Sequence, residues 1–216
     1  DRDTLNTPLF EEVAGLSGYV DRAPPAPIDF IAARPSEAGD IFFTEVLFDA
    51  APTVANDNPG EWLELYNPTT ETMDLTGCVL DGGNDPGHTF GAFEIPANTY
   101  VVIGREGNTS LNGGVDLDYV YGTDLNLANS GDWVSLTCDG SLIAEVVWPT
   151  EPSDGRSYQL DGDYLVADAS SLWCASPDDV TFGTEAGQYG TPGAPNSMLC
   201  AGEVMLLSET FDGTQT

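Results

Sequence analysis

The chain has 216 residues, of which 41% are hydrophobic, so it can form one all-β domain with tails and is not a disordered sequence. Its 36 acidic residues against 5 basic ones give a formal net charge of −31, which repels phosphates and so excludes nucleic acid and anionic membranes as partners. The same charge attracts cations, and it fits either simple solubility in a salty habitat or the binding of divalent ions such as Ca²⁺.

Residues 1–40 are predicted to form an arm and not a domain. Thr7, followed by proline, marks the start of one short helix. Residues 23–27 (APPAP) predict a stiff extended linker, and residues 28–31 are a weak strand candidate. No signal peptide is visible at Asp1, so we expect a mature product from which an export signal has been removed.

From residue 41 onward, short apolar runs alternate with turn residues, which is the pattern of a β-sandwich. Residues 100–103 (YVVI) are wholly apolar and predict a buried strand. Asp139 and Gly140 lie between two strand-like runs and predict a β-hairpin. The predicted strands are residues 41–48, 62–66, 75–80, 89–95, 100–103, 133–137, 143–148 and 157–160.

A last apolar strand is predicted outside this pattern, at Val204, Met205, Leu206 and Leu207. We therefore divide the chain into an N-terminal arm with a Pro-rich linker (1–40), a β-sandwich (41–200), and a C-terminal strand extension or the start of a further domain (201–216). No run is long and apolar enough to span a bilayer, so membrane insertion is not expected.

The four cysteines are too widely spaced for a zinc site. Their even number in an acidic chain without lysine predicts two disulfides and an oxidising compartment, so we expect the protein to be extracellular or at the cell surface. Four cysteines allow three pairings, of which we favour Cys78 with Cys138 and Cys174 with Cys200.

Six short motifs occur in a fixed order: GEWLELYN (60–67), DLTG (74–77), IPA (95–97), LANSGDWV (127–134), GRS (155–157) and GTPGAPN (190–196). In this order they resemble the lamin-tail domain family, in its bacterial secreted form, over about residues 40–196. The resemblance implies an immunoglobulin-like β-sandwich without a common active site, used for binding or structure. Cys78 stands where the family often has Trp, which, with Cys138 on the hairpin, suggests a disulfide in place of aromatic packing.

Period-two alternation places Trp62 and Glu64 on one face of their strand, and Leu63 and Leu65 on the other. We interpret this as a core face and a half-covered face. Arg156 is one of few cations, and we expect it to pair with a nearby carboxylate that holds its strand.

No catalytic site is expected. His88 is the only histidine and lies in a turn-rich loop, every cysteine has a plausible partner, and the motif G-x-S-x-G is absent. Acidic pairs carry little information in a chain with 36 acidic residues. No cofactor is required, and Ca²⁺ is the one ligand retained: Asp81, Asn84 and Asp85 supply oxygens, although solvated turns are the simpler explanation and no EF-hand pattern is present.

The favoured function is a non-catalytic extracellular structural or assembly module of a surface or fibre protein. Its partner is protein, including other copies of itself, bound when the terminal extensions add a strand to a neighbour's exposed sheet edge. The alternative is a binding module, for carbohydrate as one case, appended to a larger secreted enzyme. Exposed aromatic residues are its signal, and the candidates are Trp133, Trp148, Trp173, Tyr119 and Tyr121.

Overall fold

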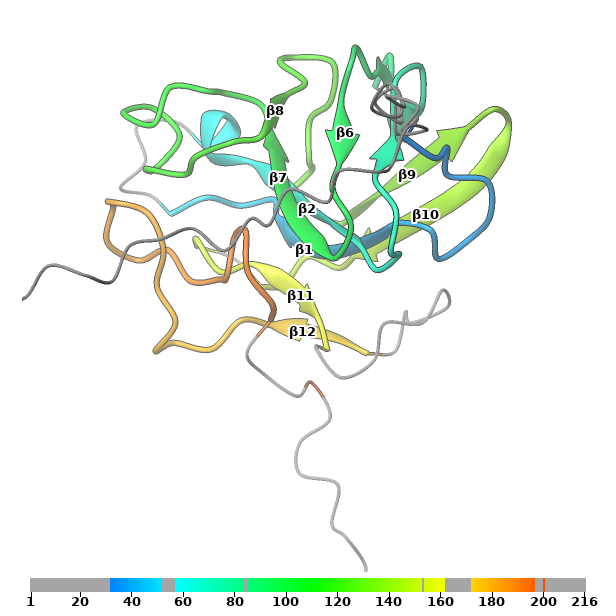
Figure 1. Ribbon diagram of the computed structural model, residues 1–216. Helices are drawn as coiled ribbons and strands as arrows, with labels where there is room; N and C mark the ends of the chain where they lie inside the picture. The colour runs from blue at the N-terminus through cyan, green and yellow to red at the C-terminus, as the bar shows by residue number, and fades with distance from the viewer. Residues whose placement is uncertain are drawn as a thin grey trace, which may run out of the picture. The chain divides into compact units, whose positions relative to one another are not determined.

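The computed structural model describes residues 32–51, 57–83, 85–152, 154–161, 172–196 and 200. These residues are almost entirely β-structure, with one short 3-10 turn, η1 (Asn58–Gly60) (Figure 1). The strands are β1 (Phe42–Leu47), β2 (Trp62–Asn67), β3 (Met73–Asp74), β4 (Val79–Gly82), β5 (His88–Thr89), β6 (Glu94–Ile95), β7 (Thr99–Gly104), β8 (Tyr119–Val120), β9 (Asp132–Cys138), β10 (Ser141–Trp148), β11 (Tyr158–Leu160) and β12 (Trp173–Ala175).

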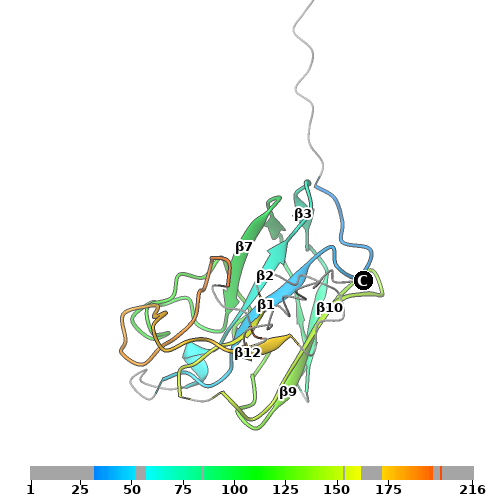
Figure 2. The same cartoon turned by 90° about the horizontal axis from the view of Figure 1, so that it is seen from below.

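Two larger sheets face each other. One has six strands in the order β12-β11-β1-β2-β7-β8, and the other has four in the order β10-β9-β4-β5; β3 and β6 form a small third sheet. All pairs are antiparallel except β7 with β8. Viewed from below, β1 and β2 lie on one side and β9 and β10 on the other (Figure 2). The predicted all-β sandwich is confirmed.

The main core fills the space between these sheets. Leu63, Leu65 and Ile103 come from the six-stranded sheet, Leu136 and Val146 from the four-stranded one, and each is at most 2% exposed. Burying each such side chain stabilises the fold by about 1.5–3 kcal/mol.

Both predicted disulfides are present, Cys78–Cys138 and Cys174–Cys200, and no described cysteine is free. Cys78 and Cys138 are fully buried in the main core, beside the paired residues Val79 and Thr137 of β4 and β9. In the chain-entropy model, closing a loop of this length contributes roughly 4 kcal/mol.

The second face of the six-stranded sheet is also buried. Trp62, Val102 and Val115 form a separate apolar cluster there, against which Phe182 packs. Phe182 meets Trp62 edge to face at 5.5 Å between ring centroids. The predicted alternation of β2 is therefore confirmed, but the face expected to be half covered is largely covered.

Three local expectations differ from the structure. The strand predicted over 75–80 begins only at Val79, because Cys78 donates a turn hydrogen bond to Leu75 O (2.8 Å). The strand predicted over 89–95 is two short strands, β5 and β6, and the short β3, β8 and β12 were not predicted. The hairpin is confirmed: Asp139 and Gly140 have φ of 49° and 84°, the positive values that a two-residue I′ turn requires.

The described chain begins in contact with the sandwich, where Ala33 forms a β-bridge with Met73. The predicted helix at Thr7, the linker, the strand at 28–31 and the segment Val204–Leu207 lie outside the described residues, so the domain division stays a prediction. No helix in the described part is long and apolar enough to cross a membrane.

Candidate functional site

Two buried glutamates dominate the second face of the six-stranded sheet. Glu45 of β1 lies directly opposite Glu64 of β2, and both are 0% exposed. A β-bulge between Phe43 and Glu45 shifts the register of β1 at this point. The bulge brings Thr44 to the same face, where its hydroxyl donates to Glu64 Oε1 at 2.6 Å.

The segment 190–196, here called the closing segment, covers this pair. The Thr191 backbone N–H donates to both carboxyl oxygens of Glu45, at 3.0 and 3.1 Å, and its hydroxyl donates to Oε2 at 3.1 Å. The Gly193 N–H donates to Glu64 Oε2 at 2.7 Å. The two carboxyls therefore accept hydrogen bonds from backbone N–H groups of a segment that belongs to no sheet, so these N–H groups are not left unpaired.

The two ends of the closing segment are held as firmly as its middle. Asn196 Nδ2 donates to Thr44 O at 2.8 Å and to Leu160 O at 2.7 Å, which ties the segment to β1 and β11. At the other end, a Cβ on Gly190 would lie 2.5 Å from Glu45 Oε1. Only glycine lets the backbone approach the carboxyl so closely.

Burial controls the protonation of the pair. Burial raises the pKa of Glu45 to about 7, although the hydrogen bonds from Ser157 and Thr191 act in the opposite direction. Burial also raises the pKa of Glu64 well above its ordinary value, and the charge of Glu45 adds to this effect. No ion pair among the described residues involves either glutamate. Burial therefore favours the protonated forms of both carboxyls.

Gln159 of β11 continues the same row, since it pairs directly with Glu45. Its side chain is fully buried, and neither its amide oxygen nor its amide nitrogen has a hydrogen-bond partner among the described residues. The row Gln159–Glu45–Glu64 is thus a polar layer closed off from solvent. The two glutamates of this row hold the closing segment through the hydrogen bonds from Thr191 and Gly193.

A second buried acid lies at the start of β2. Burial raises the pKa of Glu61 to about 8, against the hydrogen bond from the Leu127 N–H (3.1 Å) and the charge of Arg105 at 4.0 Å. Arg105 also donates to Leu125 O at 3.0 Å. Glu61 and Arg105 together fix the loop before β9.

Both ring nitrogens of His88 have hydrogen-bond partners. Nδ1 lies 2.8 Å from Asp124 Oδ2, and Nε2 lies 2.9 Å from the Tyr119 hydroxyl. Because a carboxylate only accepts, Nδ1 carries the proton in the neutral ring and the Tyr119 hydroxyl donates to Nε2. That hydroxyl also accepts from the Gly91 N–H at 3.0 Å. The sequence carboxylate–imidazole–hydroxyl resembles the catalytic triad of hydrolases, but here the hydroxyl is a phenol that already donates one hydrogen bond and accepts another. These hydrogen bonds connect β5 to β8.

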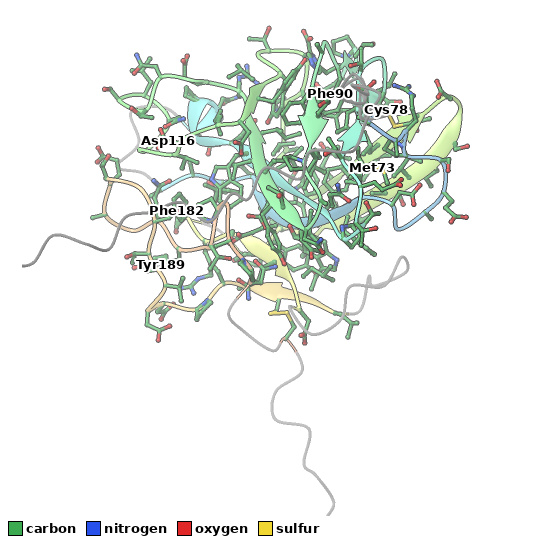
Figure 3. The ribbon with its side chains drawn as sticks, in the orientation of Figure 1. Met73, Cys78, Phe90, Asp116, Phe182 and Tyr189 are labelled. Carbon is green, nitrogen blue, oxygen red and sulfur yellow. A yellow bond between two sulfur atoms is a disulfide. The ribbon has the colours of Figure 1, made fainter. Side chains whose placement is uncertain are left out.

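Arg156 has the carboxylate partner that the sequence predicted. Its guanidinium forms an ion pair with Asp178 and donates to Ser176 O. It also lies 4.9 Å from the ring centroid of Tyr189, a cation–π contact. Phe182 and Tyr189 both lie on the loops outside the six-stranded sheet, whereas Cys78 lies among the strands of the other sheet (Figure 3).

The predicted calcium residues are only partly described. Asp81 is exposed on β4, Asp85 Oδ2 accepts from the Asn126 N–H at 2.9 Å, and Asn84 lies outside the described residues. No group of three or more His, Cys, Asp or Glu side chains able to hold a metal ion occurs in the described part of the chain. The calcium site stays a prediction.

The aromatic residues proposed for ligand binding differ in exposure. Trp148 and Tyr121 are each 2% exposed and belong to the core, where Trp148 stacks on Phe48. Trp133, Trp173 and Tyr119 are half-buried. Tyr119 is further engaged by His88, and Trp173 stacks on Tyr158. Within the described part of the chain, Trp133 is thus the one of the five that has neither a ring partner nor a side-chain hydrogen bond.

Comparison with known proteins agrees with this architecture. The family model of the Lamin Tail Domain matches residues 34–150, more than half of the chain. The match covers β1 to β10 and ends before the GRS motif and the closing segment. A search of curated proteins found no significant match.

Proposed function

The chain belongs to the lamin tail domain family, whose fold is immunoglobulin-like and non-enzymatic, and from this we propose that it is a structural or assembly module of an extracellular surface or fibre protein. It self-associates through its terminal extensions. The module supplies a rigid body, and the extensions supply the contacts between copies.

Three features support a role without catalysis. The described cysteines are all in disulfides, so no thiol is available as a nucleophile. Both nitrogens of His88 are engaged by Asp124 and Tyr119. The most strongly perturbed carboxyls, Glu45 and Glu64, are buried beneath the closing segment.

The extracellular location is supported by the two disulfides, which persist in oxidising compartments. A formal net charge of −31 keeps separate modules soluble by mutual repulsion, so association needs a specific contact and screening salt.

The observation that carries the assembly proposal is the position of the last disulfide. Cys200 is bonded to Cys174 of β12, so the sandwich is closed there, yet residues 201–216 follow and include the apolar run Val204–Leu207. The sequence predicts an apolar strand at this run, after the last disulfide of the sandwich. Such segments bind as added strands on another sheet.

Removing both extensions tests the proposal. The chain 32–200 is compared with the whole chain by electron microscopy and sedimentation velocity, with circular dichroism as the control for folding. We expect assembly by the whole chain only. Equal assembly by the trimmed chain contradicts the proposal, and saturable binding on a glycan array, lost on Trp133→Ala, favours the carbohydrate-binding alternative.

A further inference from the structure

β10 is the longest strand of the described residues, with 8 residues, and it forms one edge of the four-stranded sheet. It pairs with β9 alone. The other edge of that sheet is β5, with 2 residues. Figure 1 shows β10 beside β9 in a long hairpin at the right of the view. A long edge strand of this kind is a template for a further strand.

Among the described residues, no backbone hydrogen bond from outside the sheet reaches the second half of the outer edge of β10. In the described part of the chain, a single backbone hydrogen bond reaches this edge from outside its sheet, from Gly39 N to Ile143 O at 3.3 Å. Ile143 lies in the bulge between Leu142 and Ala144, which protects the first half of the edge. Neither lysine nor proline interrupts the stretch 144–148.

The same strand carries an apolar surface. Leu142 is 53% exposed and Val147 is 59% exposed, the two highest values among the large hydrophobic residues that the structure describes as exposed. Their neighbours Ile143 and Val146 are buried in the core, so Leu142 and Val147 point away from it. Val147 also pairs across the sheet with the half-buried Trp133.

We propose that the edge of β10 at residues 144–148 accepts the segment Val204–Leu207 of a second copy as an added strand. The proposal rests on the proposed function and names the surface through which it operates. The four apolar residues of the donor fit within the acceptor stretch 144–148. Strand addition uses main-chain hydrogen bonds, with Leu142 and Val147 offering apolar contacts beside them.

A second copy fits better than the chain's own segment. Only residues 201–203 separate Cys200 from Val204, and that link reaches about 14 Å when fully extended. Cys200 is bonded to Cys174 of β12, and its N–H donates to Asp161 just after β11, so it lies one to two strands away from β1, which faces β10 across the core. From strand and sheet spacings, this separation is about 9–13 Å, so most of the link is used in reaching β10 and little is left to align the segment along it. A neighbouring copy has no such constraint.

Paired variants of the full chain test the proposal by sedimentation velocity in about 0.5 M NaCl, where charge repulsion is screened within a few ångströms. The acceptor variant is Leu142→Lys with Val147→Lys. Its control is Leu111→Lys with Val120→Lys, which adds the same charge at the other two exposed hydrophobic residues, 44% and 46% exposed. The donor variant is Leu206→Pro.

We expect the acceptor and donor variants to need at least about a tenfold higher concentration for assembly, while the control behaves as the unmodified chain. An equimolar mixture of acceptor and donor variants should stop at a dimer, because it holds one intact donor and one intact acceptor. Assembly should also slow hydrogen exchange at the amides of residues 144–148 in the unmodified chain.

Assembly by the acceptor variant at the unmodified concentration, or a mixture that stays monomeric, overturns the β10 proposal. If the donor variant still fails to assemble in that case, the proposed function survives with another acceptor. An unmodified chain that stays monomeric overturns both. Unchanged hydrogen exchange at residues 144–148 on assembly also overturns the β10 proposal, independently of how the lysine variants fold.

Discussion

Glu45 and Glu64 lie opposite each other on β1 and β2, fully buried, and both accept hydrogen bonds from one segment far along the chain. Their partners Thr191 and Gly193 are 146 and 129 residues away in sequence. The closing segment is thus attached to the sheet through two carboxyls whose ionisation burial opposes. We therefore expect the attachment of this segment to depend on pH.

Stability should fall as pH rises through neutrality. A carboxyl whose pKa is higher in the folded state than in the unfolded state stabilises the fold below the unfolded pKa, and this contribution is lost as pH rises through the folded pKa. For Glu45 the window runs from 4.5 to about 7 and corresponds to roughly 3 kcal/mol, and the raised pKa of Glu61, about 8, acts in the same direction. Urea unfolding from pH 5 to pH 8 measures the effect.

Glu64→Gln isolates the contribution of the pair from general charge repulsion. The amide oxygen can accept from the Gly193 N–H, and the amide nitrogen can donate to the Thr44 hydroxyl, so the geometry survives without a titrating group. We expect a flatter pH dependence than in the control Glu94→Gln, which removes an exposed carboxyl. Equal slopes in the two variants argue against a role for the pair.

Gly190→Ala should detach the closing segment. Its Cβ would meet Glu45 Oε1 at 2.5 Å and Ser157 Oγ at 2.8 Å. Gly122→Ala is the matched control, since Gly122 has a φ of 70° with nothing within 4 Å of the added Cβ. We expect Gly190→Ala to cost about 1–3 kcal/mol more than the control in thermal unfolding. If the two variants lose similar amounts of stability, the loss comes from the backbone conformation of alanine at these positions and not from the contact with Glu45.

Tyr119→Phe should destabilise the protein without any catalytic consequence. The change leaves His88 Nε2 and the Gly91 N–H without their partner, at a cost of about 1–3 kcal/mol. Tyr189→Phe is the control, because it keeps the ring that contacts Arg156. Chemical denaturation measures both, and a Tyr119→Phe variant as stable as the control contradicts the structural role of this hydrogen-bonded line.

The calcium hypothesis for the loop of Asp81, Asn84 and Asp85 predicts a higher melting temperature in calcium than in chelator at matched ionic strength. Asp85→Asn keeps an oxygen for the Asn126 N–H but removes a charge, so it should reduce the difference. Equal melting temperatures of the unmodified chain in the two solutions end the hypothesis.

Local patterns in the sequence predicted the framework of the sandwich. The alternation in β2, the apolar run of β7 and the turn at Asp139 and Gly140 each act over a few residues, and each was confirmed. Motif order likewise pointed to the family that the chain belongs to.

The buried acid pair was not predictable in this way. Period two places Glu64 on the face opposite Leu63 and Leu65, but only a segment 129 residues away determines whether that face is solvated or covered. One signal was available in the sequence. A glutamate stands among large apolar residues in each of two neighbouring strands, and such glutamates can form a buried polar layer when the strands pair. Glu45, the partner of Glu64, lies at a bulge, whose register shift the apolar pattern of 41–48 does not reveal.

Sedimentation equilibrium of the whole chain over a series of concentrations in high salt tests the central claim most directly. A module that works by joining copies of itself predicts dimers and longer species that grow with concentration and disappear when residues 201–216 are removed. A single monomer mass at every concentration contradicts it.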